Sequence, residues 1–295
     1  MYNIRLFLAG IALLFAACSN DTDNSINDHT LVPVTVRVSG FSVSQDEFSG
    51  SRAATAPASY DGIQAITLAF YAEDGTEQYT ITQMKGSMPA GKTFGELELS
   101  LPIGSYTMVV IGRGHFTDDV FTLNSPTSAV YSCEHVRETF TCTQAVNITN
   151  CDAVELSATL NRIVAQVVVN STDNKTADVA KIRTTFSAGG KSFNPSTGLA
   201  IDNAGFSNTV VGMGEAGEKT TAINFLFLAA DEQTVDVTVE TLDADGAVLF
   251  SKTVNNVPLR RNRVTTLTGA MYSPAAATAS FTLNTDWLPG NSLNF

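Results

Sequence analysis

The sequence has 295 residues, of which 44% are hydrophobic and 16% charged, and its 17 basic and 29 acidic residues give a formal net charge of −12. A chain of this length and composition can bury the cores of two domains of about 100–150 residues each. Nucleic-acid-binding proteins need a basic footprint, so the acidic balance excludes nucleic acid as a partner.

The first 18 residues have the layout of an export signal. Arg5 precedes an apolar run from Leu6 to Ala17, and small residues lead to Cys18. The run is shorter than the roughly 20 residues that cross a bilayer, so residues 1–17 are predicted as a signal peptide. The Ala17–Cys18 junction resembles the lipobox of bacterial lipoproteins, although Phe15 stands where that motif usually has leucine. The resemblance implies cleavage before Cys18 and its acylation. An ordinary signal peptide with a chance cysteine is the alternative.

A polar segment, residues 18–30, follows this signal and lacks periodic apolar residues. Such composition is typical of a solvated linker. Its aspartates also resemble the signal that sends some lipoproteins to the outer cell surface. Several acyl chains anchor a protein almost permanently, because each buried methylene contributes about 0.8 kcal/mol. We therefore expect a folded body tethered by lipid to the outer membrane and exposed at the surface.

Apolar residues alternate with period two along the next part of the chain, which predicts strands and no long helix. The valines of 32–38 form the first such run. Residues 66–72 and 78–83 flank Asp74-Gly75, a dipeptide that favours a hairpin turn. Residues 112–150 are predicted as short strands and a long loop.

The same order of elements returns in the second half. Alternation over 235–240 leads to Asp245-Gly246, a strand over 248–254, a proline-containing turn at Pro258 and a strand over 264–267. This coarse repeat predicts an all-β protein with two tandem β-sandwich domains, residues 31–153 and 154–295. Similar turns occur in any all-β protein, which is the alternative explanation.

Three cysteines follow the signal: Cys133, Cys142 and Cys151. In an exported protein they allow one disulfide with three choices of pair, and the sequence does not choose among them. His135 beside Cys133 raises a metal site as an alternative, but structural zinc usually needs two close ligand pairs. We expect no metal and no cofactor.

No motif indicates catalysis. Residues 212–217 match G-x-G-x-x-G, but residues 220–230 read as a strand and not as the helix that a dinucleotide site requires, so a glycine-rich loop is predicted. The histidines are scattered, and the sequence has neither G-x-S-x-G nor H-E-x-x-H. We expect no enzyme; a hydrolase assembled from distant loops is the remaining alternative.

Arg260, Arg261 and Arg263 form the one basic cluster of the sequence. They flank a predicted strand, so they are interpreted as edge residues that prevent aggregation, with a contact for an acidic partner as the alternative.

Two segments, Leu160–Ala165 and Val257–Gly269, complete a pattern that resembles the fimbrillin family, the lipoprotein precursors and anchor or accessory subunits of type V pili. The resemblance implies transthyretin-like sandwiches and assembly by exchange of strands between subunits. In stalk subunits an arginine-specific protease removes the first strand, and Arg52 and Ala53 match that cleavage position. The candidate donor segment is Thr278–Phe295.

Within that segment, Phe281, Leu283 and Trp287 alternate along one face. The resemblance thus implies a structural subunit of a cell-surface fimbria that contributes to adhesion and has other fimbrial subunits as partners. The plain alternative is that Arg52 is a loop arginine and that residues 281–287 are the last strand of their own domain. A different function, a glycan-binding outer-membrane lipoprotein of a nutrient-uptake system, would need an exposed aromatic platform.

Overall fold

The computed structural model describes residues 30–42, 57–117, 120–211, 214–272 and 282–284. Apart from two short 3-10 turns, η1 (Pro57–Ser59) and η2 (Lys85–Ser87), every regular element in these ranges is a strand. The prediction of an all-β protein built from β-sandwiches is confirmed. The strands are β1 (Leu31–Ser42), β2 (Ala65–Ala72), β3 (Glu77–Met84), β4 (Glu96–Pro102), β5 (Gly104–Arg113), β6 (Phe121–Ser125), β7 (Ser128–Tyr131), β8 (Thr139–Ile148), β9 (Val154–Arg162), β10 (Ala165–Ser171), β11 (Lys181–Phe186), β12 (Ser192–Phe193), β13 (Phe206–Val211), β14 (Thr221–Leu226), β15 (Glu232–Leu242), β16 (Val248–Arg260), β17 (Val264–Gly269) and β18 (Thr282–Asn284).

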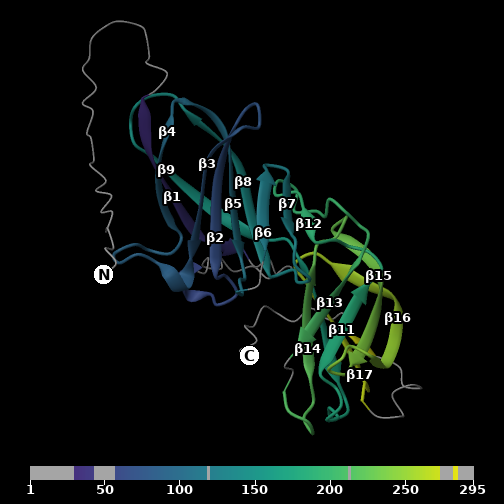
Figure 1. The fold of residues 1–295 in the computed structure, drawn as a ribbon. Coiled ribbons are helices and arrows are strands. Elements are labelled where there is room, and N and C mark those ends of the chain that lie inside the picture. The colour runs from purple at the N-terminus through teal and green to yellow at the C-terminus, as the bar shows by residue number, and fades with distance from the viewer. Residues whose placement is uncertain (1–29, 43–56, 118–119, 212–213, 273–281, 285–295) are drawn as a thin grey trace, which may run out of the picture.

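The first sandwich is one seven-stranded sheet, in the order β3-β2-β5-β8-β9-β1-β4, that folds over on itself (Figure 1). The fold lies between β8 and β9, which pair through Phe140–Arg162 and Thr141–Asn161. One core cluster receives side chains from both halves of this sheet, for example Phe70 of β2 and Leu97 of β4. The two halves therefore face each other as the layers of a sandwich.

Strand β1 confirms the alternation of the valines. Val32, Val34, Val36 and Val38 are all buried in the first core, while Arg37 between them faces solvent. The hairpin at Gly75 is confirmed as well, because β2 and β3 pair antiparallel and Gly75 has a φ of 83°. That conformation is readily adopted by glycine.

The second sandwich consists of two four-stranded sheets, β14-β10-β17-β18 and β13-β11-β15-β16. Alternate residues of the two sheets meet in a second core, among them Val167 and Val169 of β10 and Val237 and Val239 of β15. The hairpin predicted at Asp245-Gly246 joins β15 and β16, and Gly246 has a φ of 91°.

The boundary between the two sandwiches lies later than expected. Residue 154 was the predicted start of the second domain, but β9 pairs with β1 and β8 inside the first sheet. The link is Ile163-Val164, and both residues are buried. The predicted boundary is therefore wrong by the length of β9, because the turn signals before residue 154 mark a hairpin corner and not a domain linker.

Two local predictions are also corrected. Residues 139–148 form the ten-residue strand β8 and not a loop; its polar residues hid the alternation from the sequence. Pro258 lies within β16, opposite Thr234, and not in a turn. Proline is tolerated there because β16 is an edge strand. The chain turns instead at residues 261–263, where Asn262 has a φ of 58°.

A third cluster joins the two sandwiches. Its aromatic members come from both: Tyr131 of β7, Phe193 of β12 and Phe227 after β14 are fully buried. The rings of Phe193 and Phe227 stack with centroids 4.3 Å apart. Strand β12 belongs to the second half of the sequence but pairs with β7 of the first, so backbone hydrogen bonds cross the junction too (Figure 1).

We expect Phe227→Ala to lower the free energy of unfolding by about 3–5 kcal/mol, because it removes a fully buried ring and leaves a cavity. The measurement is the guanidinium midpoint of the purified protein. Leu249→Ala on the exposed edge of β16 is the control, with an expected change within about 0.5 kcal/mol. Equal shifts for the two variants would contradict a rigid junction.

Candidate functional site

Strand β1 lies between two strands that do not neighbour each other. It pairs antiparallel with β4, from Leu31–Pro102 to Arg37–Glu96, and parallel with β9, up to Ser42–Asn161. Its register with β9 shifts between Val38 and Gly40, as in a β-bulge. The first element of the described chain thus occupies an inner position of the sheet, paired along both edges.

Arg37 links the three strands on the outer face. Its Nε lies 3.1 Å from the Glu96 carboxylate of β4, and its Nη1 lies 2.9 Å from the Glu155 carboxylate of β9. These carboxylates, Glu155 most of all, raise the pKa of Arg37. All three side chains face solvent, which screens the attraction. The contacts therefore favour the register of β1 more than they stabilise the domain.

Most of the predicted site residues lie outside the described ranges. These are Ala17, Cys18, Arg52, Ala53, Phe281 and Trp287. Leu283 is in β18, where its backbone pairs antiparallel with Leu267 of β17. The described part of the candidate donor segment is therefore a three-residue strand at the edge of the second sandwich.

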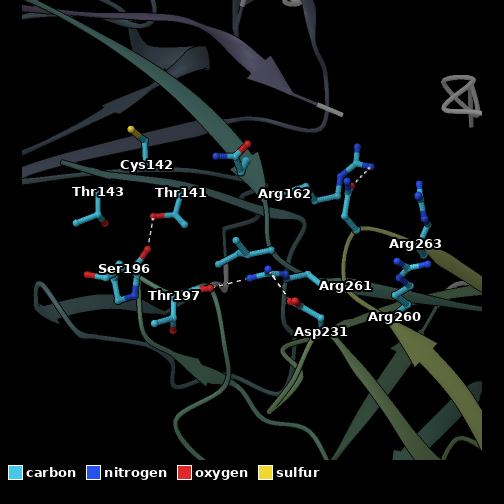
Figure 2. A pocket seen from close by; sticks show the side chains of 15 residues that line it. Thr141, Cys142, Thr143, Arg162, Ser196, Thr197, Asp231, Arg260, Arg261 and Arg263 are labelled. Carbon is cyan, nitrogen blue, oxygen red and sulfur yellow. Dashed lines mark hydrogen bonds and ion pairs between the residues drawn. The ribbon is translucent and has the colours of Figure 1, made fainter. Parts of the chain in front are cut away.

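A second feature is a cavity of about 520 Å³ at the junction, which we call the arginine cleft. It lies between β8, the end of β9, the loop at 195–198 and the turn at 261–263. Figure 2 shows Thr141 and Thr143 on one wall and Arg260 and Arg263 on the opposite side. Four arginines and one aspartate, Asp231, line it.

Arg162 is fixed on the first sandwich. Its Nη2 lies 2.6 Å from the Glu138 carboxylate, and the Tyr60 hydroxyl donates to the same carboxylate at 2.7 Å. Its guanidinium carbon stands 5.1 Å from the Phe140 ring centre. Burial, and next the charge of Glu138, raise the pKa of Tyr60 above its ordinary value of 10.0. This group is tightly packed and acts as a support for Arg162.

Arg261 also lines the cleft, and two contacts hold its guanidinium group in place. Its Nη2 lies 2.6 Å from Asp231, and its Nη1 donates to the Thr197 carbonyl oxygen at 2.7 Å. A Cβ on Gly198, where φ is 72°, would lie 2.9 Å from Arg261 Nη1 and 2.6 Å from Ile163 Cγ2. Only glycine allows this close approach.

The turn that carries the arginines docks on the link between the sandwiches. The Asn262 backbone N–H donates to the Val164 carbonyl oxygen at 2.8 Å, and the Asn262 side-chain oxygen accepts from Arg162 Nη1 at 3.3 Å. The cluster predicted from the sequence thus meets Arg162, one hundred positions earlier in the chain. No local pattern could have indicated this encounter.

The sulfur and glycine predictions have mixed outcomes. Cys133 and Cys142 are free thiols, so none of the three possible pairings forms within the described residues. Cys142 lines the arginine cleft, and burial raises its pKa. Strand β14 follows the glycine-rich stretch, so the strand predicted after this stretch is confirmed. In the described ranges no cluster of three or more His, Cys, Asp or Glu side chains could hold a metal ion.

The aromatic side chains do not form a sugar-binding platform in the described part of the chain. The large rings are mostly fully buried: Phe70, Tyr71, Tyr131, Phe140, Phe186, Phe193 and Phe227. Phe116 is an exception, and Arg137 lies over its ring at 4.2 Å. No helix among the described residues is long and apolar enough to cross a membrane.

The model of DUF6562, a family of unknown function, matches residues 30–287. A search of curated protein sequences finds no match. Among solved structures, a candidate adhesin from Bacteroides ovatus has 11% identity and a TM-score of 0.50, over 77% of this chain and 84% of its own. A candidate polysaccharide-binding protein from Bacteroides thetaiotaomicron has 9% identity and a TM-score of 0.51, over 81% and 92%.

A fimbrial anchor protein from Porphyromonas gingivalis has 12% identity over 87% of this chain and 98% of its own. Its TM-score is 0.45, too low to carry an argument. At their low identities, the similarities to the two Bacteroides proteins show a shared fold and nothing more.

The raised pKa of Tyr60 predicts a loss of stability in alkali. The folded-state pKa lies above the unfolded value of about 10, so the stabilisation is fully present below pH 10 and is lost as pH rises through the folded-state pKa. We expect the gap in unfolding free energy between the wild type and Tyr60→Phe to narrow above about pH 10, by at most about 1.4 kcal/mol per pH unit. Urea unfolding at several alkaline pH values measures it, and a gap independent of pH would show that Tyr60 titrates normally.

Proposed function

We propose that this chain, which belongs to the family of unknown function DUF6562, is the lipid-anchored precursor of a structural subunit of a cell-surface fimbria and that the subunit contributes to adhesion. The uncut precursor carries the lipid on Cys18, and this anchor lies in the outer membrane. The partners are other fimbrial subunits. They assemble by exchange of strands, in which a segment of one subunit completes the sheet of the next.

The observation that carries this proposal is the placement of β1. It is the first described strand, it is paired along both edges, and it supplies four buried valines to the first core. Removing it would leave β4 and β9 with unpaired backbone groups and an apolar trough between them. An added strand satisfies both at once.

The energies are adequate for a non-covalent fibre. Burial of each valine contributes about 1.5–3 kcal/mol, or roughly 6–12 kcal/mol for all four, before the cost of ordering the incoming strand. Backbone hydrogen bonds to β4 and β9 add to this. A strand that replaces β1 therefore regains most of what its loss costs.

The described part of the candidate donor segment, β18, is a short edge strand. Three residues of β18 pair with β17, on one edge only. Detaching so short an edge strand costs less than detaching β1, which favours Thr278–Phe295 as the segment that leaves. The names of the two Bacteroides neighbours, a candidate adhesin and a candidate polysaccharide-binding protein, are compatible with a surface role on this fold.

The test is digestion of the full chain with an arginine-specific protease, followed by electrophoresis without boiling. We expect a cut after Arg52 and a ladder of multimers that collapses on boiling, because the trough opened by loss of β1 accepts a neighbour's strand. Arg52→Gln is the matched control and should give neither the cut nor the ladder.

Digestion of the chain on the surface of cells that produce it provides an independent readout of the anchor. The mass of the mature N-terminus should show lipid-bearing Cys18 before digestion and a bare Ala53 after it. An anchor subunit would keep its lipid and need no cut. If multimers form neither with nor without cleavage, the role as a stalk subunit is refuted.

A further inference from the structure

We propose that the arginine cleft binds acidic oligosaccharides, sugars that carry a carboxylate on a polyhydroxylated ring. The described residues that line the site come from both sandwiches, and none of them belongs to β1. The inference therefore stands apart from the assembly proposed above.

The cleft concentrates arginines in a chain that is acidic as a whole. Four of the ten arginines in a protein of net charge −12 line this one cavity, and three of them pair with the carboxylates of Glu138, Asp231 and Glu232. Asp231 is already engaged by Arg261 at 2.6 Å. Arginine clusters of this kind suit carboxylates, because the planar guanidinium can donate two parallel N–H bonds to them.

We assign recognition of the ligand to Arg260 and Arg263 because of their position between two cavities. Both line the arginine cleft and also an adjoining cavity of about 370 Å³ between the start of β15, the end of β16 and the start of β17. Arg260 contacts Glu232 at 3.0 Å, but that carboxylate side chain is 68% exposed. An exposed ion pair of this type contributes little and exchanges readily with another carboxylate.

Arg162 and Arg261 are structural members of the cleft lining. Each is held by a short ion pair, to Glu138 and to Asp231, and each is less exposed than Arg260. These pairs fix both guanidinium groups in place on the lining of the cleft. Side chains that are already fixed need no further ordering when a ligand binds beside them.

The remaining lining selects sugars over other anions. Hydroxyl and amide side chains, among them Thr143, Asn161 and Ser196, line the arginine cleft, and Gln233 and Thr234 line the adjoining cavity. None of the described residues that line the two cavities is aromatic. A ligand here must be polar on its faces as well as its edges, which fits a charged sugar and does not fit a neutral one that is recognised by ring stacking.

The size of the two cavities indicates more than one sugar unit. Ligand sites usually have volumes of about 300–1,000 Å³. The two cavities, of about 520 and 370 Å³, share Arg260 and Arg263. A repeating acidic sugar could place one carboxylate at these shared arginines and extend into both cavities.

The experiment is calorimetric titration of the full chain in detergent with four probes: oligogalacturonate, oligosialic acid, neutral galactose oligomers and polyglutamate. We expect saturable binding of at least one of the two acidic sugars, and whichever binds identifies the source of the carboxylate. Binding should weaken as sodium chloride is raised, because ion pairs to an exposed site are screened.

The variant that tests the site is the pair Arg260→Gln and Arg263→Gln. It should weaken binding of the acidic sugar at least about tenfold, because two charge-assisted hydrogen-bonding groups are lost. Arg37→Gln removes the same kind of charge from the outer face of β1, away from the cleft, and should leave the affinity unchanged. Unfolding midpoints of all variants establish that each protein is folded.

The outcomes that overturn the inference are distinct. Binding of neither acidic sugar, or equal binding of the neutral sugar, excludes an acidic-sugar site. Tighter binding of polyglutamate would assign the cleft to an acidic polypeptide instead. Unchanged affinity in the arginine pair variant would place any sugar site elsewhere on the chain.

Discussion

The first sandwich depends on one strand being held between two neighbours that do not pair with each other. Strand β1 joins β4 to β9, and its valines occupy the centre of the core that both halves of the folded sheet share. A parallel partner such as β9 must come from far along the chain, and here it lies more than one hundred residues away. The closure of the domain is therefore a long-range event that needs its first strand.

The same long-range pairing brings the two sandwiches together. Strand β9 runs beside β1 and ends at Arg162, and the buried link Ile163-Val164 leads directly into the second sheet. The turn at Asn262 docks on that link, which brings Arg261 and its neighbours against the end of β9. The arginine cleft thus results from the way in which the two domains join.

Local patterns predicted the local structure well. The alternation of the valines in β1 and the glycines that follow Asp74 and Asp245 determine strands and hairpins within a few residues, and both hairpins form where expected. The predictions were wrong for β8, where polar residues interrupt the alternation, and for Pro258, where an edge strand tolerates a proline. Periodicity could not place β9 in the first sheet, because pairing depends on partners distant in sequence. For the same reason Arg162 was missed as a partner of the arginine cluster.

The measurement that tests the central claim most directly is amide hydrogen exchange of the chain before and after it is cut at Arg52. If β1 closes the first sandwich and can be displaced, the amides of β4 and β9 that pair with it should be protected in the intact chain. They should lose protection by orders of magnitude when β1 departs, while β10 and β17 stay protected. A donor strand from another subunit should restore the protection. Unchanged exchange in β4 and β9 after removal of β1 would contradict the account.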